Sequence, residues 1–348
     1  MGLFSFTQEI AIDLGTANTV IIHNDKIVVD EPSVVALDKR TDKLLAVGEK
    51  ARLMHGKTHE NIRTIRPLRD GVIADFYAAE QMIRGMVKMV SSKSHWFSPS
   101  LRMVIGIPSG STEVEIRAVR DSSEHAGGRD VYMIYEPMAA AIGIGLDVQA
   151  PEGNMIVTKA AGSLIVDIGG GTTEIAVISL GGIVSNNSIR VAGDDLTNDI
   201  QEYMGRQHNV KVGERTAELI KINVGSALTE LDNPPEDYVV HGPNRMTALP
   251  MEVPISYQEI AHCIEKSISK IEAAVLNALE HTPPELYADI VRNGIWLAGG
   301  GALLRGLDKR LTDKIGIPFH IAEDPLHAVA KGTGVALKNI DQFSFLIR

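Results

Sequence analysis

Two short segments of the chain combine an aspartate with glycine and threonine in the same order. Glycine lets the backbone approach an anion closely, and the amide groups of a tight turn can converge on phosphate oxygens. Hydroxyl and amide side chains add further donors, so two such turns facing each other would hold a polyphosphate from both sides. The first turn contains Asp13, Gly15, Thr16, Ala17 and Asn18, and the second contains Asp167, Gly169, Gly170, Gly171, Thr172 and Thr173.

The two aspartates need a separate explanation, because carboxylates repel phosphate. A magnesium ion would resolve the conflict, since Mg²⁺ keeps several water molecules and binds few carboxylates together with phosphate oxygens. We therefore predict that Asp13 and Asp167 hold Mg²⁺ through water. The alternative is that each aspartate caps its own turn. The matching order of the two turns favours the metal.

A third glycine-rich turn follows the apolar segment 295–297 and is expected to open a helix. Turns of this kind, leading from a strand into a helix, suit close contact with a nucleotide. By itself the signal is weak, because any α/β turn can have this composition. It gains meaning as the third member of an ordered set, and its residues are Gly299, Gly300, Gly301, Ala302 and Leu303.

The elements that must position these turns can be predicted from the apolar pattern. Each acidic turn lies between two apolar runs, which is typical of a strand, a tight turn and a hairpin. The first set spans residues 10–29 and the second spans residues 164–184. The two aspartates lie nearly half a chain length apart, so a duplicated α/β domain is predicted. Two unrelated hairpins are the alternative, which the shared residue order disfavours.

Helices are predicted between the strands. Ser256 and Glu259 have the spacing of a capping box, and an apolar stripe of three- and four-residue spacing follows over residues 260–279, which predicts one helix that stops at Pro283-Pro284. Another helix is expected to begin near Thr112 and to end at Gly127-Gly128. Strands mixed with helices throughout indicate the α/β class.

Composition excludes several classes of protein. The 348 residues suggest two domains, and the net charge of -10 argues against a nucleic-acid partner. The small basic cluster of Arg63, Arg66 and Arg69 is expected to be a solvated loop. The one cysteine, Cys263, excludes an intramolecular disulfide and favours the reducing cytoplasm. Neither a secretory signal nor an apolar run of about 20 residues, as a membrane-spanning helix needs, is found.

In this order the three turns resemble those of the actin, sugar-kinase and heat-shock-chaperone ATPase superfamily. Within it the chain is similar to the MreB family of bacterial actin homologues. Further resembling segments are residues 31–36, 136–143, 213–218 and 330–334. The resemblance implies an actin-like fold, with two duplicated ribonuclease-H-like α/β domains around a nucleotide cleft. The implied first half is residues 1–148, with a small subdomain inserted at about 32–76. The implied second half is residues 149–322, with a small subdomain inserted at about 190–254. Residues 323–348 would return to the first half.

The resemblance also implies roles for residues in the site. The cofactors would be ATP, with GTP as an alternative, and Mg²⁺. Glu136 would orient the attacking water with help from Thr172, although an acid at a helix N-terminus is its other interpretation. One helix would hold the ribose and flank the adenine, unless it is a solvated face laced with salt bridges. Its residues are Glu214, Arg215, Thr216, Ala217, Glu218 and Lys221.

By resemblance, the function is that of a cytoskeletal ATPase whose slow hydrolysis is coupled to assembly into filaments. Such filaments would lie on the inner face of the cell membrane and direct cell-wall synthesis and rod shape. The implied partners are further copies of the chain, membrane shape proteins and the cell-wall synthesis machinery. A small-molecule kinase of the same superfamily is the alternative, but no sugar-binding set is found. A chaperone ATPase would need a substrate-binding domain, for which we expect no room after residue 334.

Exposed apolar residues suggest how the membrane would be reached. Aromatic side chains in polar loops suit a lipid interface, and weak sites add up along a polymer. The alternative is that these side chains pack on the protein's own core. The residues are Leu3, Phe4 and Phe6 near the N-terminus and Trp96 and Phe97 in a predicted loop. One departure from the family pattern is a longer segment at 154–163, expected at the hinge between the halves.

Overall fold

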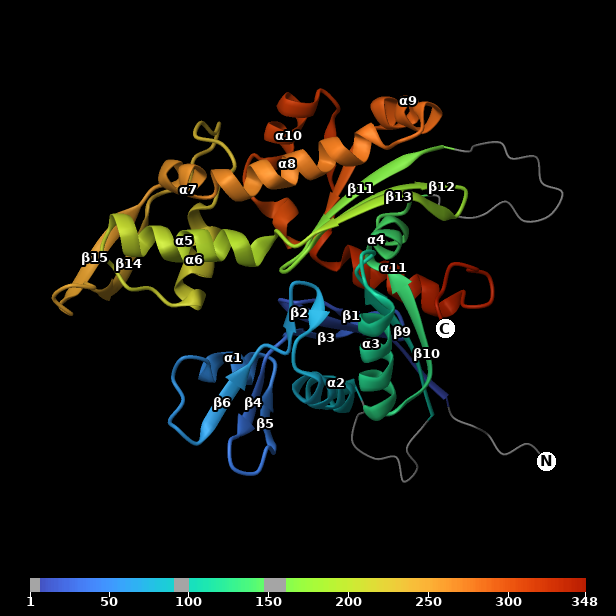
Figure 1. Ribbon diagram of the computed structural model, residues 1–348, viewed down its shortest axis with the longest axis horizontal. Helices are drawn as coiled ribbons and strands as arrows, with labels where there is room; N and C mark the ends of the chain where they lie inside the picture. Colours follow the sequence, from blue (N-terminus) through green and yellow to red (C-terminus); the bar gives the residue numbers. More distant parts are fainter. Residues whose placement is uncertain (1–6, 91–99, 147–160) are drawn as a thin grey trace.

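The computed structural model describes residues 7–90, 100–146 and 161–348, and two five-stranded sheets dominate it (Figure 1). The first sheet has the order β10-β9-β1-β2-β3 and consists of β1 (Thr7–Leu14), β2 (Asn18–His23), β3 (Lys26–Pro32), β9 (Ser100–Ile107) and β10 (Gly128–Tyr135). The second has the order β13-β12-β11-β16-β17 and consists of β11 (Ser163–Ile168), β12 (Thr173–Ser179), β13 (Gly182–Ile189), β16 (Ile295–Ala298) and β17 (Phe319–Ile321).

The two sheets share one topology. In each, three consecutive strands form an antiparallel meander, and two later strands add in parallel beside the first strand of the meander. Strands β1 and β11 are central and largely buried, so their apolar runs are near-continuous rather than alternating. The predicted strands, their tight acidic turns and the duplicated α/β architecture are confirmed.

Helices and two smaller units complete the fold. The smaller units are a three-stranded sheet with α1 and a two-stranded ribbon with α5 to α7, and both lie on the left of the view (Figure 1). The small strands are β4 (Val35–Asp38), β5 (Leu44–Val47), β6 (Ile62–Ile65), β7 (Leu68–Arg69), β8 (Val72–Ile73), β14 (Tyr238–Pro243) and β15 (Pro250–Ile255). The helices are α1 (Glu49–Met54), α2 (Phe76–Val90), α3 (Glu113–His125), α4 (Glu136–Gly143), α5 (Gly193–Gln207), α6 (Glu214–Val224), α7 (Tyr257–Cys263), α8 (Glu265–Glu280), α9 (Pro284–Asn293), α10 (Leu307–Ile315) and α11 (Ala328–Lys338), with 3₁₀ turns η1 (Gly300–Leu303) and η2 (Pro325–His327).

Helices α4 and α11 lie between the two sheets and join them (Figure 1). They cross in close contact: a Cβ atom on Gly143 would collide with the carbonyl of Ala328, and one on Gly332 would collide with the carbonyl of Ala139. The buried cluster around them includes residues of both sheets, among them Ala11 and Ile165. The packing of this helix pair therefore holds the two halves together.

The helix predicted to begin after Ser256 and to stop at Pro283-Pro284 is two helices. The chain turns at Ile264, where ψ is near 0°, and α7 and α8 follow on either side. The apolar stripe stays buried through the break, because α7 packs on α5 while α8 packs on β12 and β13. The predicted capping box at Ser256 is confirmed, and the helix predicted near Thr112 begins with a second one. In each, the hydroxyl accepts a hydrogen bond from the amide three residues on.

Candidate functional site

The two acidic turns lie against each other at the interface between the halves. A Cβ atom on Gly170 would lie 2.8 Å from the Cβ of Ala17, and one on Gly171 would lie 2.7 Å from Oγ1 of Thr16. Real Cβ atoms do not approach other atoms so closely, so these two positions require glycine. The structure thus brings together the two turns that the sequence singled out.

Each turn is braced by hydrogen bonds of its own half. In the first turn, the Ser33 hydroxyl donates to the carbonyl of Gly15 at 2.6 Å, and the Gly71 amide donates to Oγ1 of Thr16 at 3.1 Å. In the second turn, the Asp194 amide donates to the carbonyl of Gly170 at 2.8 Å, and the Thr173 hydroxyl donates to the Val191 carbonyl. Ala17 and Asn18 are exposed, with Asn18 Nδ2 3.4 Å from Asp30.

Carboxylates gather directly behind the turns. Burial raises the pKa of Asp13 to about 7, partly offset by His327, and raises that of Asp167 to about 8 with the help of Asp13. Burial also raises the pKa of Glu136 well above its usual value, and the charges of Glu174, Asp13 and Asp167 add to the effect. In their ionised forms these carboxyl groups would concentrate negative charge behind the two turns.

This charge and one orphaned atom fit a cation. Oδ1 of Asp167 is buried and has no hydrogen-bond partner among the described residues. Groups of three or more metal-ligating side chains are absent from the part of the chain that the structure describes. A donor set of two carboxylates suits Mg²⁺, which takes its remaining ligands from water and phosphate. Asp13 and Asp167 thus fit a hydrated magnesium ion better than a fully protein-bound metal.

Glu174 belongs to this cluster, although sequence reasoning gave it no role. Its side chain is fully buried and accepts hydrogen bonds from the amide and hydroxyl of Ser109, at 3.0 and 2.5 Å, and from the hydroxyl of Ser188 at 2.6 Å. Ser109 lies in the first half and Ser188 in the second. The signal for it was an acid inside the apolar strand β12, one residue after the second turn.

The two predicted catalytic residues lie at the ends of different elements. Glu136 is the first residue of α4, preceding a proline at the helix start, and its Cγ lies close to Gly106 of β9. Thr172 is buried in the second turn, where its methyl group packs near Gly71 and Pro108. Glu136 is thus within electrostatic reach of both aspartates, while Thr172 lines the contact between the halves.

The third glycine turn packs on the end of β11. Gly299 has φ of +77°, and a Cβ there would lie 2.5 Å from Oδ1 of Asp167, so glycine permits both the backbone angle and the contact. Gly301 packs equally closely on Ile168. Ala302 is buried and Leu303 is 53% exposed. A short 3₁₀ turn, Gly300–Leu303, begins here, and α10 follows only at Leu307.

The helix predicted around Glu214 to Lys221 is α6, and Lys221 connects it to the start of α5 beside the second turn. Lys221 donates to the carbonyl of Gly193 at 2.8 Å and pairs with Glu218 at 2.7 Å, while Glu218 accepts from the Thr197 hydroxyl at 2.6 Å. Gly193 in turn donates its amide to Gly169. On the remaining positions of this helix, Ala217 is buried in the core, Thr216 is half-buried and Arg215 is exposed.

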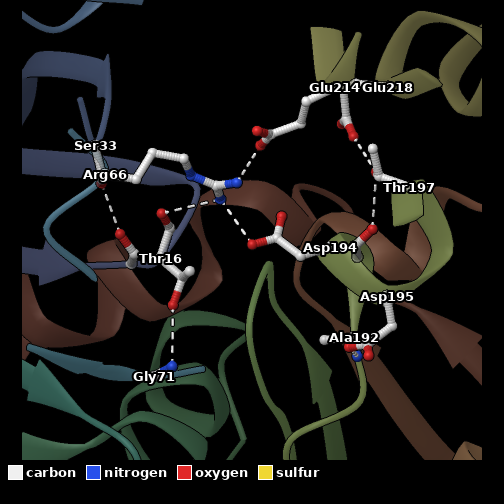
Figure 2. A network of polar contacts seen from close by, with 12 residues as sticks. Thr16, Ser33, Arg66, Gly71, Ala192, Asp194, Asp195, Thr197, Glu214 and Glu218 are labelled. Atoms are coloured by element: carbon white, nitrogen blue, oxygen red, sulfur yellow. Dashed lines mark hydrogen bonds and ion pairs between the residues drawn. The ribbon is translucent and has the colours of Figure 1, made fainter. Parts of the chain in front are cut away.

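Arg66 corrects the expectation of a solvated basic loop. It lies between β6 and β7, its side chain is 20% exposed, and it reaches across to the second half (Figure 2). Nη1 donates to Oε1 of Glu214, and Nη2 donates to Oδ2 of Asp194 at 2.7 Å and lies 3.5 Å from the carbonyl of Thr16. Burial opposes its charge, but the two carboxylates outweigh this and raise its pKa. These long-range partners could not be read from the sequence.

Two matched α/β halves that bring phosphate-type turns together define an actin-like protein. The family model described as MreB/Mbl protein matches residues 7–345 of the chain. The chain is 46% identical over 347 residues to the cell shape-determining protein MreB of Escherichia coli K12, with 97% of this chain and 95% of that protein covered. It is 44% identical over 338 residues to Mbl of Bacillus subtilis 168, with 97% and 98% covered. The chain belongs to the MreB/Mbl family.

Solved structures agree with this assignment. MreB 5 of Spiroplasma citri bound to AMPPNP matches with a TM-score of 0.87 at 38% identity, covering 96% of this chain and 97% of that one. A double helical filament of MamK matches with a TM-score of 0.76 at 20% identity, which supports the fold alone. The predicted actin-like fold and family are confirmed, and the small-molecule kinase alternative finds no support.

The predicted membrane contact concerns residues that the structure does not describe. Leu3, Phe4, Phe6, Trp96 and Phe97 lie outside the described residues, as does most of the longer segment at 154–163. Among the helices that the structure describes, none has the length and apolar character required to cross a bilayer.

Proposed function

We propose that this chain is an ATP-dependent, filament-forming cytoskeletal protein that directs cell shape. The observation that carries the proposal is the meeting of two glycine-rich turns, one from each half, in front of four mutually repelling carboxylates. Curated relatives of nearly the same length are cell shape-determining proteins, and a related structure holds AMPPNP.

The nucleotide would contact all three turns. Its phosphates would lie between Gly15 to Asn18 and Gly169 to Thr173, whose backbone amides supply donors without side-chain bulk. The adenosine would contact Gly299 to Leu303, while Glu214, Glu218 and Lys221 would flank the ribose and base. ATP is the proposed ligand, and GTP is the competitor to test against it.

Asp13 and Asp167 would hold Mg²⁺. When bound, the ion neutralises phosphate charge and lowers the pKa values that burial raises in these carboxyl groups. Glu136 would orient and polarise the attacking water from the start of α4, and Thr172 would hydrogen-bond the same water. Burial and the neighbouring carboxylates raise the pKa of Glu136, which makes its ionised form a stronger base toward a proton of that water.

Assembly would follow from the shape of the nucleotide-bound protomer. Because the turns come from opposite halves, binding changes how the halves sit on one another, and a head-to-tail contact that depends on this angle builds an open polymer. We propose the halves at 1–148 and 149–322, with 323–348 returning to the first. The return is supported by the backbone pairing of Ile347 with Met133 of β10.

The proposed location is the cytoplasm, with the polymer bound peripherally to the inner face of the cell membrane. Apolar side chains at Leu3, Phe4, Phe6, Trp96 and Phe97 would each contribute about 1.5–3 kcal/mol when buried in lipid. Ordering the N-terminus opposes this, so one protomer would bind weakly and a filament strongly. Membrane shape proteins and cell-wall synthases are the proposed partners.

The testing experiment is sedimentation with simultaneous measurement of phosphate release. With ATP and Mg²⁺ the protein should pellet at high speed and release phosphate slowly, whereas without nucleotide it should stay in the supernatant. A coupled screen of small-molecule acceptors is run in parallel. Transfer of phosphate to an acceptor without pelleting would overturn the proposal and favour a kinase.

A further inference from the structure

Arg66 makes an ionic contact between the two halves beside the first turn. Its guanidinium joins three structures: the first turn through the Thr16 carbonyl, the start of α5 through Asp194, and the start of α6 through Glu214 (Figure 2). The residue comes from the first half, and both carboxylates come from the second. Its side chain is 20% exposed, so the pairs are partly desolvated.

The two carboxylates are themselves fixed by the backbone. Asp194 donates its amide to Gly170 of the second turn, so the position of this residue follows that turn. Glu214 is the first residue of α6, three residues from Ala217, which is buried in the core of the second half. A guanidinium is a planar fork that holds two partners in set directions. Arg66 therefore links the phosphate turns of both halves to the first residue of α6.

One oxygen of Glu214 remains for a ligand. Arg66 holds Oε1, whereas Oε2 lies 3.9 Å from Nε2 of His55, which is beyond hydrogen-bond range. The side chain of Glu214 is 41% exposed. A carboxylate that is held by one oxygen has already lost its side-chain conformational entropy. A hydrogen bond accepted by the other oxygen therefore costs little further entropy. The hydroxyl groups of a ribose are the donors that the proposed nucleotide would offer here.

We propose that Arg66 is a positioning residue for ribose recognition: it holds Glu214 across the interface, so that the sugar hydroxyls are recognised only when the halves are closed. The inference rests on the proposed nucleotide site and adds to it a residue from the opposite half. In its absence, Glu214 would still carry a charge but would rotate freely in solvent. The nucleotide would then lose the contact to its sugar while keeping the contacts to its phosphates.

The test compares binding of ATP with binding of 2′,3′-dideoxy-ATP, by calorimetry with Mg²⁺ on the full chain below its polymerisation concentration. A hydrogen bond to a charged group contributes about tenfold in affinity, so the wild type should prefer ATP by about tenfold or more. Arg66→Gln and Glu214→Gln should each reduce this preference to about twofold, and the double variant should reduce it no further. Arg66→Lys, which keeps the charge but not the fork, should fall between.

Arg63→Gln is the matched control. Arg63 is three residues away, and its Nη2 pairs with Asp42 at 2.8 Å within the first half. This variant removes an arginine and an ion pair without touching the interface, so its preference should equal that of the wild type.

Four outcomes would overturn the inference. In the first, the wild type binds ATP and 2′,3′-dideoxy-ATP equally. In the second and third, Arg66→Gln binds both ligands more weakly by the same factor, or binds both more tightly. In the fourth, the Arg63→Gln control also loses the preference for ATP. A wild type that binds neither ligand would instead contradict the proposed function itself, so the two failures are distinguishable.

Discussion

Replacement of Asp167 by asparagine should stabilise the protein in the absence of nucleotide and metal. Asp167 is 5% exposed, Oδ1 has no partner among the described residues, and its pKa is raised from 3.8 to about 8. A carboxyl group whose pKa is higher in the folded state binds more protons when folded than when unfolded. Its ionisation therefore costs stability as the pH rises from about 4 toward 8.

The size of the effect follows from the same linkage. Between pH 5 and pH 7 the unfolded carboxyl group is ionised and the folded one is protonated, which gives a slope of about 1.4 kcal/mol per pH unit. Over this window the wild type should lose up to about 2.5 kcal/mol through this residue. Asp13, whose pKa is raised to about 7, adds a loss of the same sign over the same pH range.

Urea denaturation at pH 5, 6 and 7, with chelator and without nucleotide, measures this directly. Asp167→Asn should show a flatter pH profile than the wild type and a higher free energy of unfolding at pH 7. The order should reverse with saturating Mg²⁺-ATP, because only the wild type gains from the ligand. Asp38→Asn is the matched control, since that carboxyl group is on the surface and its pKa is lowered by hydrogen bonds from Thr41. Parallel profiles for Asp167→Asn and the wild type would refute the reasoning.

Three other outcomes are expected. Glu136→Ala and Thr172→Ala should slow phosphate release by about 100-fold while leaving nucleotide binding intact, and near-normal release by both would remove them from the mechanism. Gly332→Ala should destabilise the fold by about 1–3 kcal/mol or more in urea, because the added Cβ would strike α4, whereas Gly213→Ala, with nothing within 4 Å, should cost far less. A variant lacking residues 2–6 and carrying serine at both loop aromatics should polymerise with ATP yet fail to pellet with liposomes. Equal pelleting with lipid by this variant and the wild type, with polymerisation intact, would show that these residues belong to the core or have no part in membrane binding.

The predictable part of the site is the part built from local sequence. A strand, an acidic turn and a second strand are specified by neighbouring residues, so the turns at Asp13 and Asp167 and the strands beside them could be predicted from spacing. The break at Ile264 could not, because the apolar stripe is the same for one helix as for two. Only the surfaces that α7 and α8 cover decide between them.

The residues that sequence reasoning missed or misjudged act across the interface. Glu174 takes its partners from Ser109, 65 positions earlier, and from the next strand, while Arg66 meets Glu214 148 positions later. No periodicity of the chain encodes such pairs. The sequence shows only that these residues differ from their surroundings. Glu174 is an acid within an apolar strand, and Arg66 is an arginine in a segment predicted to be a loop. In this protein both residues lie where the two halves meet.

The contacts between the halves differ in how readily they can change. Helix α4 packs on β11 and β12 of the second half and α11 packs on β1 and β9 of the first. Where the two helices meet, Gly143 and Gly332 interlock backbone with backbone, and such close packing resists sliding. At Glu174 the contact is a buried set of hydrogen bonds, which is costly to leave unpaired. At Arg66 it is ionic and partly exposed, and is therefore weakened by salt and easily exchanged. We therefore expect the helix pair to act as the hinge and Arg66 to lie on the side that opens. Opening should then become easier as ionic strength rises, because salt screens the exposed ionic contacts between the halves, which are those of Arg66 and of Arg190 with Glu115.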